Sequence, residues 1–499
     1  MDPVTLQVMV GALRAACDEM GVVLVRSAHS ANVKERRDAS TGLFDAAGEM
    51  VMQAEHIPVH LGAMPLAVAA VIEEEQRPGD AWILNDPYQG GTHLPDITLV
   101  SPIFCGGELA GFAGSRAHHA DVGGKLPGSM PANSGTLEEE GVVIPPSKLV
   151  SEGELDRELL DNLTGGMRNP DQRRADLRAQ LAAGRTGAAR VTELVDRHGL
   201  ETVREAMRET LDYSERRTRA RIEELEDGAR EATDVLEAPE GDLELRLRAE
   251  VKSDELLLDF TGSAEQHNGN LNCPLAVTLS ACYFAVRVLT DPDVPPCAGA
   301  YRPVTVSAPE GSLLNARPPH AVVAGNVETS SRVADLVLAA FGRALGQGTM
   351  NNLTLGNDRF TYYETLGGGQ GACPDADGPS AVHVAMSNTL NTPIEALELE
   401  FPLRAVEYAV RRGSGGVGAH RGGDGVVREL EALDEMSYSL ITERRRHAPR
   451  GADDGEPGRP GRNLLNGEEL EPKASGMLRT GDRLRIETPG GGGHGRPPG

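Results

Sequence analysis

Residues 85–96 concentrate metal-capable side chains between turn-forming residues. His93 and Asp96 lie close together in this stretch, and His118 and His119 follow in a second segment. Imidazole nitrogens and a carboxylate oxygen together suit a divalent ion such as Zn, Mn or Fe, which would activate water or polarise a carbonyl. The alternative is that these side chains only form hydrogen bonds within loops.

The adjacent histidines His118 and His119 are expected to have different roles. Neighbouring side chains of an extended chain point to opposite faces, so the two cannot easily bind one ion. One is therefore predicted to be a ligand, and the other to contact substrate or to support the site. Asp121 follows closely and is a candidate general base, or a residue that orients a ligand.

A predicted β-hairpin brings these segments together. Residues 97–104 form the first predicted strand, Gly106-Gly107 the turn, and residues 109–114 the returning strand. The segment with His93 and Asp96 precedes the first strand, and His118 follows the second. Both segments are thus expected at the same end of the hairpin, where they can converge on one ion.

Two further pairs of residues could contact a substrate. Arg36 and Arg37 could bind an anionic substrate or a phosphorylated intermediate, and a solvated charged face is the equal alternative. Asn326 and Glu328 lie in a polar loop before a predicted helix. They could recognise a substrate amide, or the loop could simply cap that helix.

A looser set of histidines could face the same cavity: His29, His56 and His60. A buried histidine with satisfied hydrogen bonds is a frequent structural element, and each of the three could be one. We therefore predict no specific role for them.

The composition indicates a large globular protein. The 499 residues are 39% hydrophobic and 25% charged, and the formal net charge is −26. This acidity argues against a nucleic-acid partner and against docking on anionic membranes. The six cysteines form no CxxC pair, the N-terminus is acidic, and no apolar run is long enough to cross a bilayer. We expect a cytoplasmic protein.

The pattern of apolar residues predicts a mixed α+β fold. Residues 1–150 are expected to form an N-terminal α/β unit with the metal site, opened by a helix that Asp2 caps. Residues 151–238 read as a charged helical segment up to about residue 236. Residues 239–499 read as a mixed, strand-rich unit that includes buried helices near residues 274–289 and 333–345.

No sequence pattern for binding ATP is present. Gly124-Lys125 lacks the other residues of a P-loop, and the GxGxxG match at residues 413–418 has no βαβ unit around it. Any ATP chemistry would therefore need another chain or an unrecognised site.

Several long motifs, in one order along nearly the whole chain, resemble the hydantoinase B family. That family comprises the B-type components of ATP-dependent N-methylhydantoinase and 5-oxoprolinase type enzymes, and it is related to acetone carboxylase subunits. The matching stretches are residues 34–38, 56–62, 85–96, 118–121, 127–131, 325–330, 347–352, 443–446 and 488–493. Residues 39–41 depart from the family pattern, which usually has an aromatic residue and a cysteine there.

The resemblance implies a division of labour between two subunits. A hydantoinase A-type partner with an actin-like ATPase fold would phosphorylate the amide oxygen of a cyclic amide. The B-type component would then open the ring with metal-bound water. In the related carboxylases the corresponding His, Asp and His bind a divalent metal, which carries over to His93, Asp96 and His118.

We therefore predict the catalytic B-type component of an ATP-dependent cyclic amidohydrolase, acting in a hetero-oligomer. Asp121 or His119 would move protons, and Arg36, Arg37, Asn326 and Glu328 would bind substrate. Two alternatives remain open at this point: a component of an acetone-type carboxylase, and a non-catalytic scaffold for the ATPase.

Overall fold

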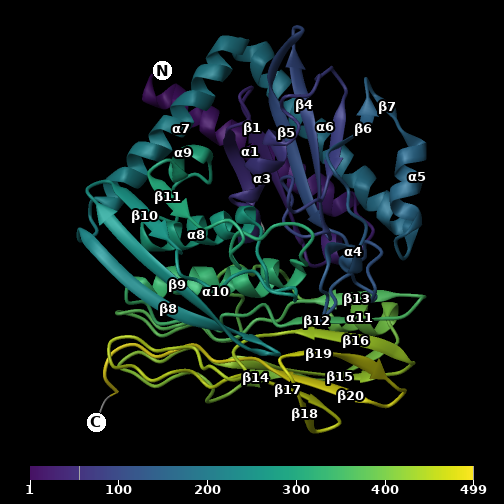
Figure 1. Ribbon diagram of the computed structural model, residues 1–499. Coiled ribbons are helices and arrows are strands. Elements are labelled where there is room, and N and C mark those ends of the chain that lie inside the picture. Colours follow the sequence, from purple (N-terminus) through teal and green to yellow (C-terminus); the bar gives the residue numbers. More distant parts are fainter. Residues whose placement is uncertain (56, 498–499) are drawn as a thin grey trace.

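The computed structural model describes residues 1–55 and 57–497, so His56 lies outside the described residues. Helices and strands are mixed, and the described strands form four sheets, which confirms the predicted α+β class. The N-terminal elements form the upper half of the molecule in Figure 1, and the C-terminal sheets form the lower half.

A seven-stranded sheet organises the N-terminal half. Its order is β2-β1-β5-β4-β3-β6-β7. The strands are β1 (Ala39–Phe44), β2 (Met50–Glu55), β3 (Ala81–Leu84), β4 (Asp96–Cys105), β5 (Glu108–His118), β6 (Ser147–Ser151) and β7 (Glu154–Leu155). The predicted hairpin is confirmed as β4 and β5, which pair antiparallel along their length.

Long helices cover this sheet. The predicted first helix is confirmed as α1 (Pro3–Ser27), and the Asp2 side chain accepts hydrogen bonds from two backbone amides of its first turn. The other helices that pack in this half are α5 (Arg157–Gly165), α6 (Pro170–His198) and α7 (Leu200–Ile222). Helix α6 packs against α1, β4 and β5.

The helical segment ends earlier than the sequence predicts. Residues 228–238 are not helical but form β8 (Gly228–Ala238), which pairs along its whole length with β9 (Gly241–Lys252). Cross-strand pairing decides this: Arg230 and Glu231 of β8 lie toward solvent, whereas Asp234 and Glu237 are buried against neighbouring elements. The predicted boundary at residue 238 falls in the turn of this hairpin, and the division into three units stays a prediction.

Two buried helices follow where the sequence predicts them, although the second begins at Ser330 and already ends at Ala340. They are α8 (Leu275–Leu289) and α10 (Ser330–Ala340), which pack on each other, and α10 also packs on β8 and β9. The sheet beside them has the order β11-β10-β9-β8, with β10 (Glu255–Asp259) and β11 (Val304–Ser307).

The remaining strands form two sheets at the bottom of Figure 1. One has the order β13-β12-β16-β19, with β12 (Asn352–Gly356), β13 (Thr361–Glu364), β16 (Met436–Ile441) and β19 (Lys473–Leu478). The other has the order β14-β15-β20-β17-β18, with β14 (Leu403–Arg411), β15 (Gly425–Ala432), β20 (Arg483–Glu487), β17 (Arg462–Leu465) and β18 (Glu468–Leu470).

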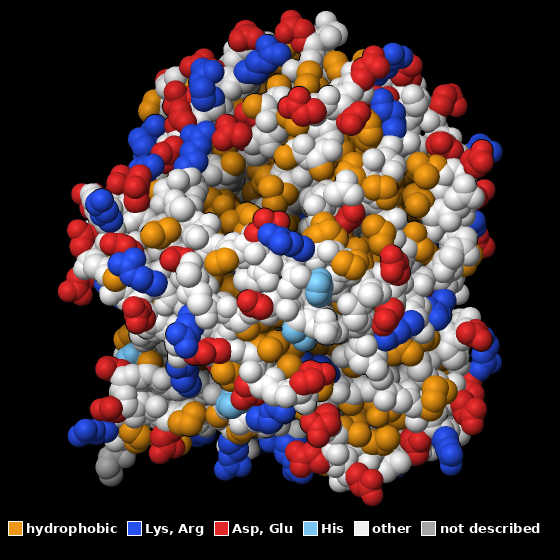
Figure 2. All heavy atoms as spheres, in the orientation of Figure 1, with side chains coloured by type: hydrophobic (Ala, Val, Ile, Leu, Met, Phe, Trp, Pro, Cys, Tyr) orange, Lys and Arg blue, Asp and Glu red, His pale blue; other side chains and the backbone are white. Residues whose placement is uncertain are grey.

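Short helical turns complete the fold. They are α2 (Ala31–Lys34), η1 (Pro58–His60), α3 (Ala63–Ala69), α4 (Leu137–Glu140), α9 (Ala298–Tyr301), η2 (Gly325–Thr329) and α11 (Ile394–Glu400). None of the described helices is long and apolar enough to cross a membrane. On the face in Figure 2, acidic and basic side chains are interspersed, and apolar side chains gather in its upper half.

Candidate metal centre

The open end of the β4–β5 hairpin carries the predicted metal ligands. Asp96 is the first residue of β4, His118 is the last residue of β5, and the two are cross-strand partners. Side chains of directly opposed residues share one face of a sheet. The hairpin register therefore places the carboxylate and the imidazole together, and the turn before β4 adds His93.

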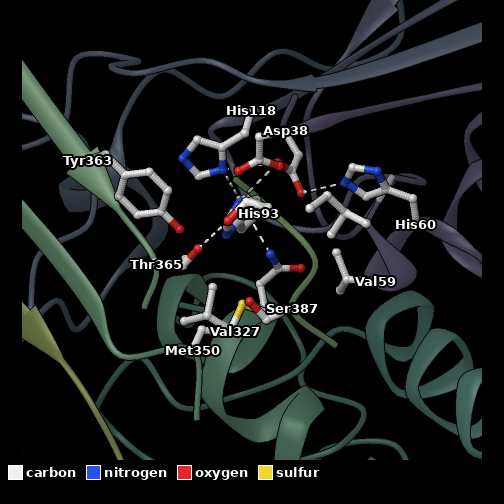
Figure 3. Close-up of a pocket in the computed structure, with 14 residues that line it drawn as sticks. Asp38, Val59, His60, His93, His118, Val327, Met350, Tyr363, Thr365 and Ser387 are labelled. Carbon is white, nitrogen blue, oxygen red and sulfur yellow. Dashed lines mark hydrogen bonds and ion pairs between the residues drawn. The ribbon is translucent and has the colours of Figure 1, made fainter. Parts of the chain in front are cut away.

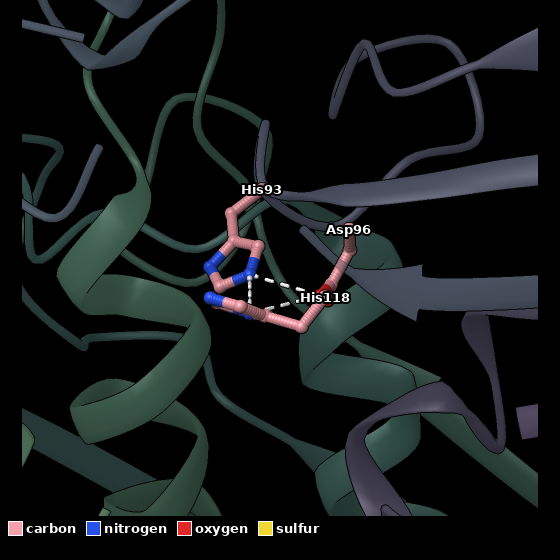
Figure 4. Close-up of side chains that lie close together, drawn as sticks. All are labelled: His93, Asp96 and His118. Atoms are coloured by element: carbon pink, nitrogen blue, oxygen red, sulfur yellow. Dashed lines mark hydrogen bonds and ion pairs between the residues drawn. The ribbon is translucent and has the colours of Figure 1, made fainter. Parts of the chain in front are cut away.

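Three ligand atoms of these side chains converge (Figure 4). The His93 Nε2 atom lies 3.1 Å from Asp96 Oδ1 and 3.3 Å from His118 Nδ1, and His118 Nδ1 lies 3.3 Å from Asp96 Oδ1. Metal–ligand bonds of about 2.1 Å place neighbouring ligand atoms roughly 3 Å apart or slightly more. The triangle thus has the dimensions of one face of a coordination shell, and the predicted convergence of the three side chains is confirmed.

The loop before β4 is held by hydrogen bonds of the Asn85 side chain and by close backbone packing at Gly91. The Asn85 side chain donates to the carbonyls of Leu94 and Val142 and accepts from the Ile144 amide. At Gly91 a Cβ atom would lie 2.3 Å from the Asn85 carbonyl oxygen, so no larger residue fits without a shift of backbone. These contacts fix the path of the chain that leads to His93.

The second oxygen of Asp96 is engaged by other residues. Thr92 donates to Asp96 Oδ2 at 2.8 Å, and His60 Nε2 lies 3.4 Å from the same atom. Burial alone would raise the pKa of Asp96, but His93, His118 and His60 together hold it well below its usual range. Asp96 is therefore a carboxylate that turns Oδ1 toward the two imidazoles.

A narrow, buried cavity surrounds the triad (Figure 3). Its volume is about 20 Å³, which is room for one water-sized group and not for a ring. The N-terminal half contributes Asp38 and His60 to its wall, beside the three candidate ligands, and the C-terminal half contributes Asn326 and Tyr363. Val59, Val327 and Met350 supply apolar surface.

The residues present fit a divalent ion. Two imidazoles and one carboxylate form a donor set that Zn, Mn and Fe accept, and all three side chains are buried. The Nδ2 atom of Asn326 lies 3.4 Å from His93 Nε2, and its Oδ1 atom is buried without a partner. The cavity wall thus provides a further oxygen atom, Asn326 Oδ1, of a type that coordinates metal ions.

The predicted catalytic residues do not line this cavity. The His119 ring points away from His118 and donates from Nε2 to Gln180, and burial lowers its pKa to about 4. The Asp121 carboxylate accepts hydrogen bonds from the backbone amides of Gly123, Gly128 and Arg168 and from the Arg168 side chain. The prediction that His119 or Asp121 moves protons stays a prediction, and their placement favours structural roles.

Of the four predicted substrate-binding residues, one lines the cavity and three do not. Asn326 lines the cavity. Arg36 lies behind the wall, where it donates to the Tyr363 carbonyl and the Thr365 hydroxyl, and Arg37 is exposed. Glu328 is also behind the wall and accepts from the Met350 amide. A substrate role for these residues remains a prediction.

Tyr363 is one of the cavity residues that the sequence did not reveal. Its ring stacks on the His118 ring at 4.5 Å between centroids, and its hydroxyl donates to Asn352 at 2.6 Å. It lies in a short strand far along the chain, where a tyrosine is an ordinary core residue. No local pattern distinguishes it. His60 was only one of several histidines without an assigned role, and His29 is exposed.

Fold and site together define a class: a mixed α+β chain with a buried His-Asp-His centre at a hairpin end. The chain belongs to the Hydantoinase B/oxoprolinase family, whose sequence profile matches residues 2–497. The predicted relationship is therefore confirmed.

The relatives that match the chain fall into two groups, one of similar length and one of much longer proteins. An uncharacterised protein of Methanocaldococcus jannaschii is 39% identical over 100% of this chain and 91% of its own length. A 5-oxoprolinase of Dictyostelium discoideum is 37% identical over 99% of this chain but only 40% of its own length. The B-type component of a putative D-/L-hydantoinase from a Pseudomonas strain is 31% identical over 100% of this chain and 90% of its own length.

Two solved structures share the fold. The ATP-dependent caprolactamase from Pseudomonas jessenii superposes with a TM-score of 0.93 at 28% identity, over 99% of this chain and 91% of that one. An acetone carboxylase chain superposes with a TM-score of 0.89 at 19% identity, over 99% and 76% of the two chains. The second likeness concerns the fold alone. The comparisons support the prediction of an enzyme of the hydrolase class that 5-oxoprolinase and hydantoinase represent.

Proposed function

We propose that this chain is the ring-opening component of an ATP-dependent cyclic amidohydrolase. The observation that carries the proposal is the convergence of His93, Asp96 and His118 in a buried cavity of a Hydantoinase B/oxoprolinase chain. In the net reaction one water is added across the C–N bond of a ring amide. The carbonyl carbon gains the hydroxyl and the nitrogen gains the proton, while a second water cleaves ATP to ADP and phosphate.

His93, Asp96 and His118 would hold a divalent ion. When bound, such an ion supplies Lewis acidity, which polarises an oxygen and lowers the pKa of water. Thr92 and His60 keep the Asp96 carboxylate oriented through its second oxygen.

The other cavity residues would position the amide. The free Oδ1 atom of Asn326 can accept the N–H of a ring amide beside the triad. Val59, Val327 and Met350 exclude bulk water from the same space, which strengthens polar contacts there.

The ATP-dependent step would take place outside this chain. No P-loop pattern is present in the sequence, and the chain spans about two fifths of the 5-oxoprolinase relatives. We infer a hydantoinase A-type ATPase partner that phosphorylates the amide oxygen, in a hetero-oligomer. The relatives of matching length include the B-type component of a putative hydantoinase, which supports this arrangement.

The test is metal content together with ring opening in the complex with the ATPase partner. The chain purified without added ions should carry about one divalent ion. His93→Ala should bring this below about a tenth and abolish ATP-dependent ring opening of hydantoins and lactams. His198→Ala, at an exposed helix end, is the matched control and should change neither.

Two results would overturn the proposal. Full turnover in His93→Ala would favour a scaffold for the ATPase. A strict requirement for bicarbonate would favour the carboxylase alternative.

A further inference from the structure

A second cavity lies directly outside the metal centre. Its volume is about 350 Å³, within the range of small-molecule pockets. Ser387 lines both this chamber and the cavity around the triad, and Pro58 of the chamber is flanked by Ile57 and Val59 of the cavity. The two spaces are therefore neighbours, and the larger one has the volume for a ring.

The wall between the two spaces has a strained backbone. Ala385 lies in the turn from Val384 to Ser387 and has a φ of 50°. A non-glycine residue in the left-handed region costs on the order of 1 kcal/mol and persists where the surrounding structure imposes it. Such outliers cluster at ligand-binding segments, and this one stands at the junction of the two cavities.

The chamber is lined by apolar and polar residues together. Phe284, Val288, Leu338 and Val384 provide apolar side chains. His383 Nδ1 is hydrogen-bonded to the Ser387 hydroxyl at 2.5 Å, and its Nε2 atom is buried without a partner. A ring with a polar amide matches this surface.

The charges of the chamber point to the type of ring. Asp335 is the one ionisable acid or base, apart from His383, among the described residues that line it. The carboxylate of Asp335 accepts a hydrogen bond from Arg444, which also bonds Asp234. Burial and the nearby Arg36 lower the pKa of His383 to about 4, so its ring is neutral near pH 7. The described lining therefore offers no cation to pair with a carboxylate on the substrate.

We propose that this chamber holds the substrate ring and selects cyclic amides without a negatively charged substituent. An anionic ring would lose its hydration there, and no cation on the described lining would compensate it, since Asp335 is itself paired with Arg444. The inference rests on the proposed function, because it assigns the substrate class of the same metal centre.

A matched pair of substrates tests the selection. 5-Oxoproline and 2-pyrrolidinone have the same five-membered lactam and differ by one carboxylate. In the complex with the ATPase partner, we expect kcat/KM for 2-pyrrolidinone to exceed that for 5-oxoproline by about 10-fold or more. A preference for 5-oxoproline would overturn the inference.

A charge placed in the chamber tests whether the substrate selection takes place there. Val288 is 45% exposed on α8 and lines the chamber, so Val288→Lys adds a cation there without filling the core. We expect the ratio of kcat/KM to shift toward 5-oxoproline by about 10-fold. Val22→Lys, on α1 and 47% exposed, is the control and should leave the ratio unchanged. An unchanged ratio in Val288→Lys would place the selection elsewhere and overturn the role of the chamber.

The two proposals fail in different ways. If the metal-loaded complex opens neither lactams nor hydantoins, the proposed function fails. If it opens rings but prefers 5-oxoproline, or ignores the charge at position 288, the proposed function stands and only the chamber inference fails.

Discussion

At the scale of single residues, Asp96 is the residue on which the candidate metal centre converges. One of its oxygens faces His93 and His118, and the other accepts from Thr92. Each of its contacts favours the ionised form, and together they outweigh the cost of burial. The nearby acid Glu328 has the opposite environment, since burial and the repulsion of Glu443 raise its pKa to about 8.

Glu328 should make stability depend on pH. Its pKa is about 4.3 in an unfolded chain and about 8 in the folded protein, so only the unfolded state loses this proton between those values. The free energy of unfolding therefore falls as pH rises from about 4.5 to 8. Glu328→Gln should remove up to about 4 kcal/mol of this loss, measured by denaturant unfolding at pH 5 and pH 8.

An exposed acid provides the comparison for that experiment. Glu154→Gln, in the short strand β7, should keep the full pH dependence of the wild type. Equal slopes for Glu328→Gln and the wild type would show that Glu328 titrates normally.

At the scale of elements, two segments bring the centre together. The β4–β5 hairpin supplies Asp96 and His118 by its register. The π-helical turn η2 before α10 supplies Asn326, and such turns occur often at functional sites. A Cβ atom at Gly325 would lie 1.8 Å from the Asn272 carbonyl oxygen, so this turn needs glycine to approach its neighbour.

Gly91, in the loop before β4, should likewise not tolerate a larger side chain. A methyl group there would meet the Asn85 carbonyl oxygen, so Gly91→Ala should displace the loop that carries His93. We expect a loss of about 1–3 kcal/mol in stability and metal binding weaker by about 10–100-fold. A chelator competition titration and thermal unfolding would measure the two effects.

Gly11→Ala is the matched control. It lies in helix α1 with nothing within 4 Å of the added Cβ, and alanine favours helix, so stability should rise slightly. Unaltered metal affinity in Gly91→Ala would contradict the role given to this loop.

At the scale of the whole molecule, the two halves meet at the metal centre, and a buried ion cluster ties together distant elements of the C-terminal half. The cluster joins Asp234 of β8 to Arg332 and Asp335 of α10 and to Glu443 and Arg444 after β16. All five side chains are buried. Removal of one member leaves its buried partners charged or unsatisfied.

Arg444→Met should therefore destabilise the whole chain. The Arg444 guanidinium bonds both Asp234 and Asp335, and its loss leaves two buried carboxylates underpaired. We expect a loss of about 3–5 kcal/mol in the free energy of unfolding. Arg359→Met removes an exposed ion pair with Asp434 and should cost at most about 1 kcal/mol. Equal losses in the two variants would contradict a structural role for the cluster.

The sequence by itself determined the local structure and the ligand candidates. A helix cap at Asp2, the hairpin at Gly106-Gly107 and the spacing of His93 and Asp96 are read from neighbouring residues, because turn chemistry and periodicity are local properties. The position of His118 beside Asp96 also followed, since hairpin register couples two segments that are close along the chain.

Only the tertiary structure decided what lies around that centre. Residues 228–238 form a strand because β9 pairs with them, although their charges resemble those of the preceding helices. Tyr363, Ser387 and most of the chamber come from segments far along the chain from His93, and Asp121 is hydrogen-bonded to Arg168. Such contacts depend on how distant elements pack, and that packing leaves no periodic trace in the local sequence.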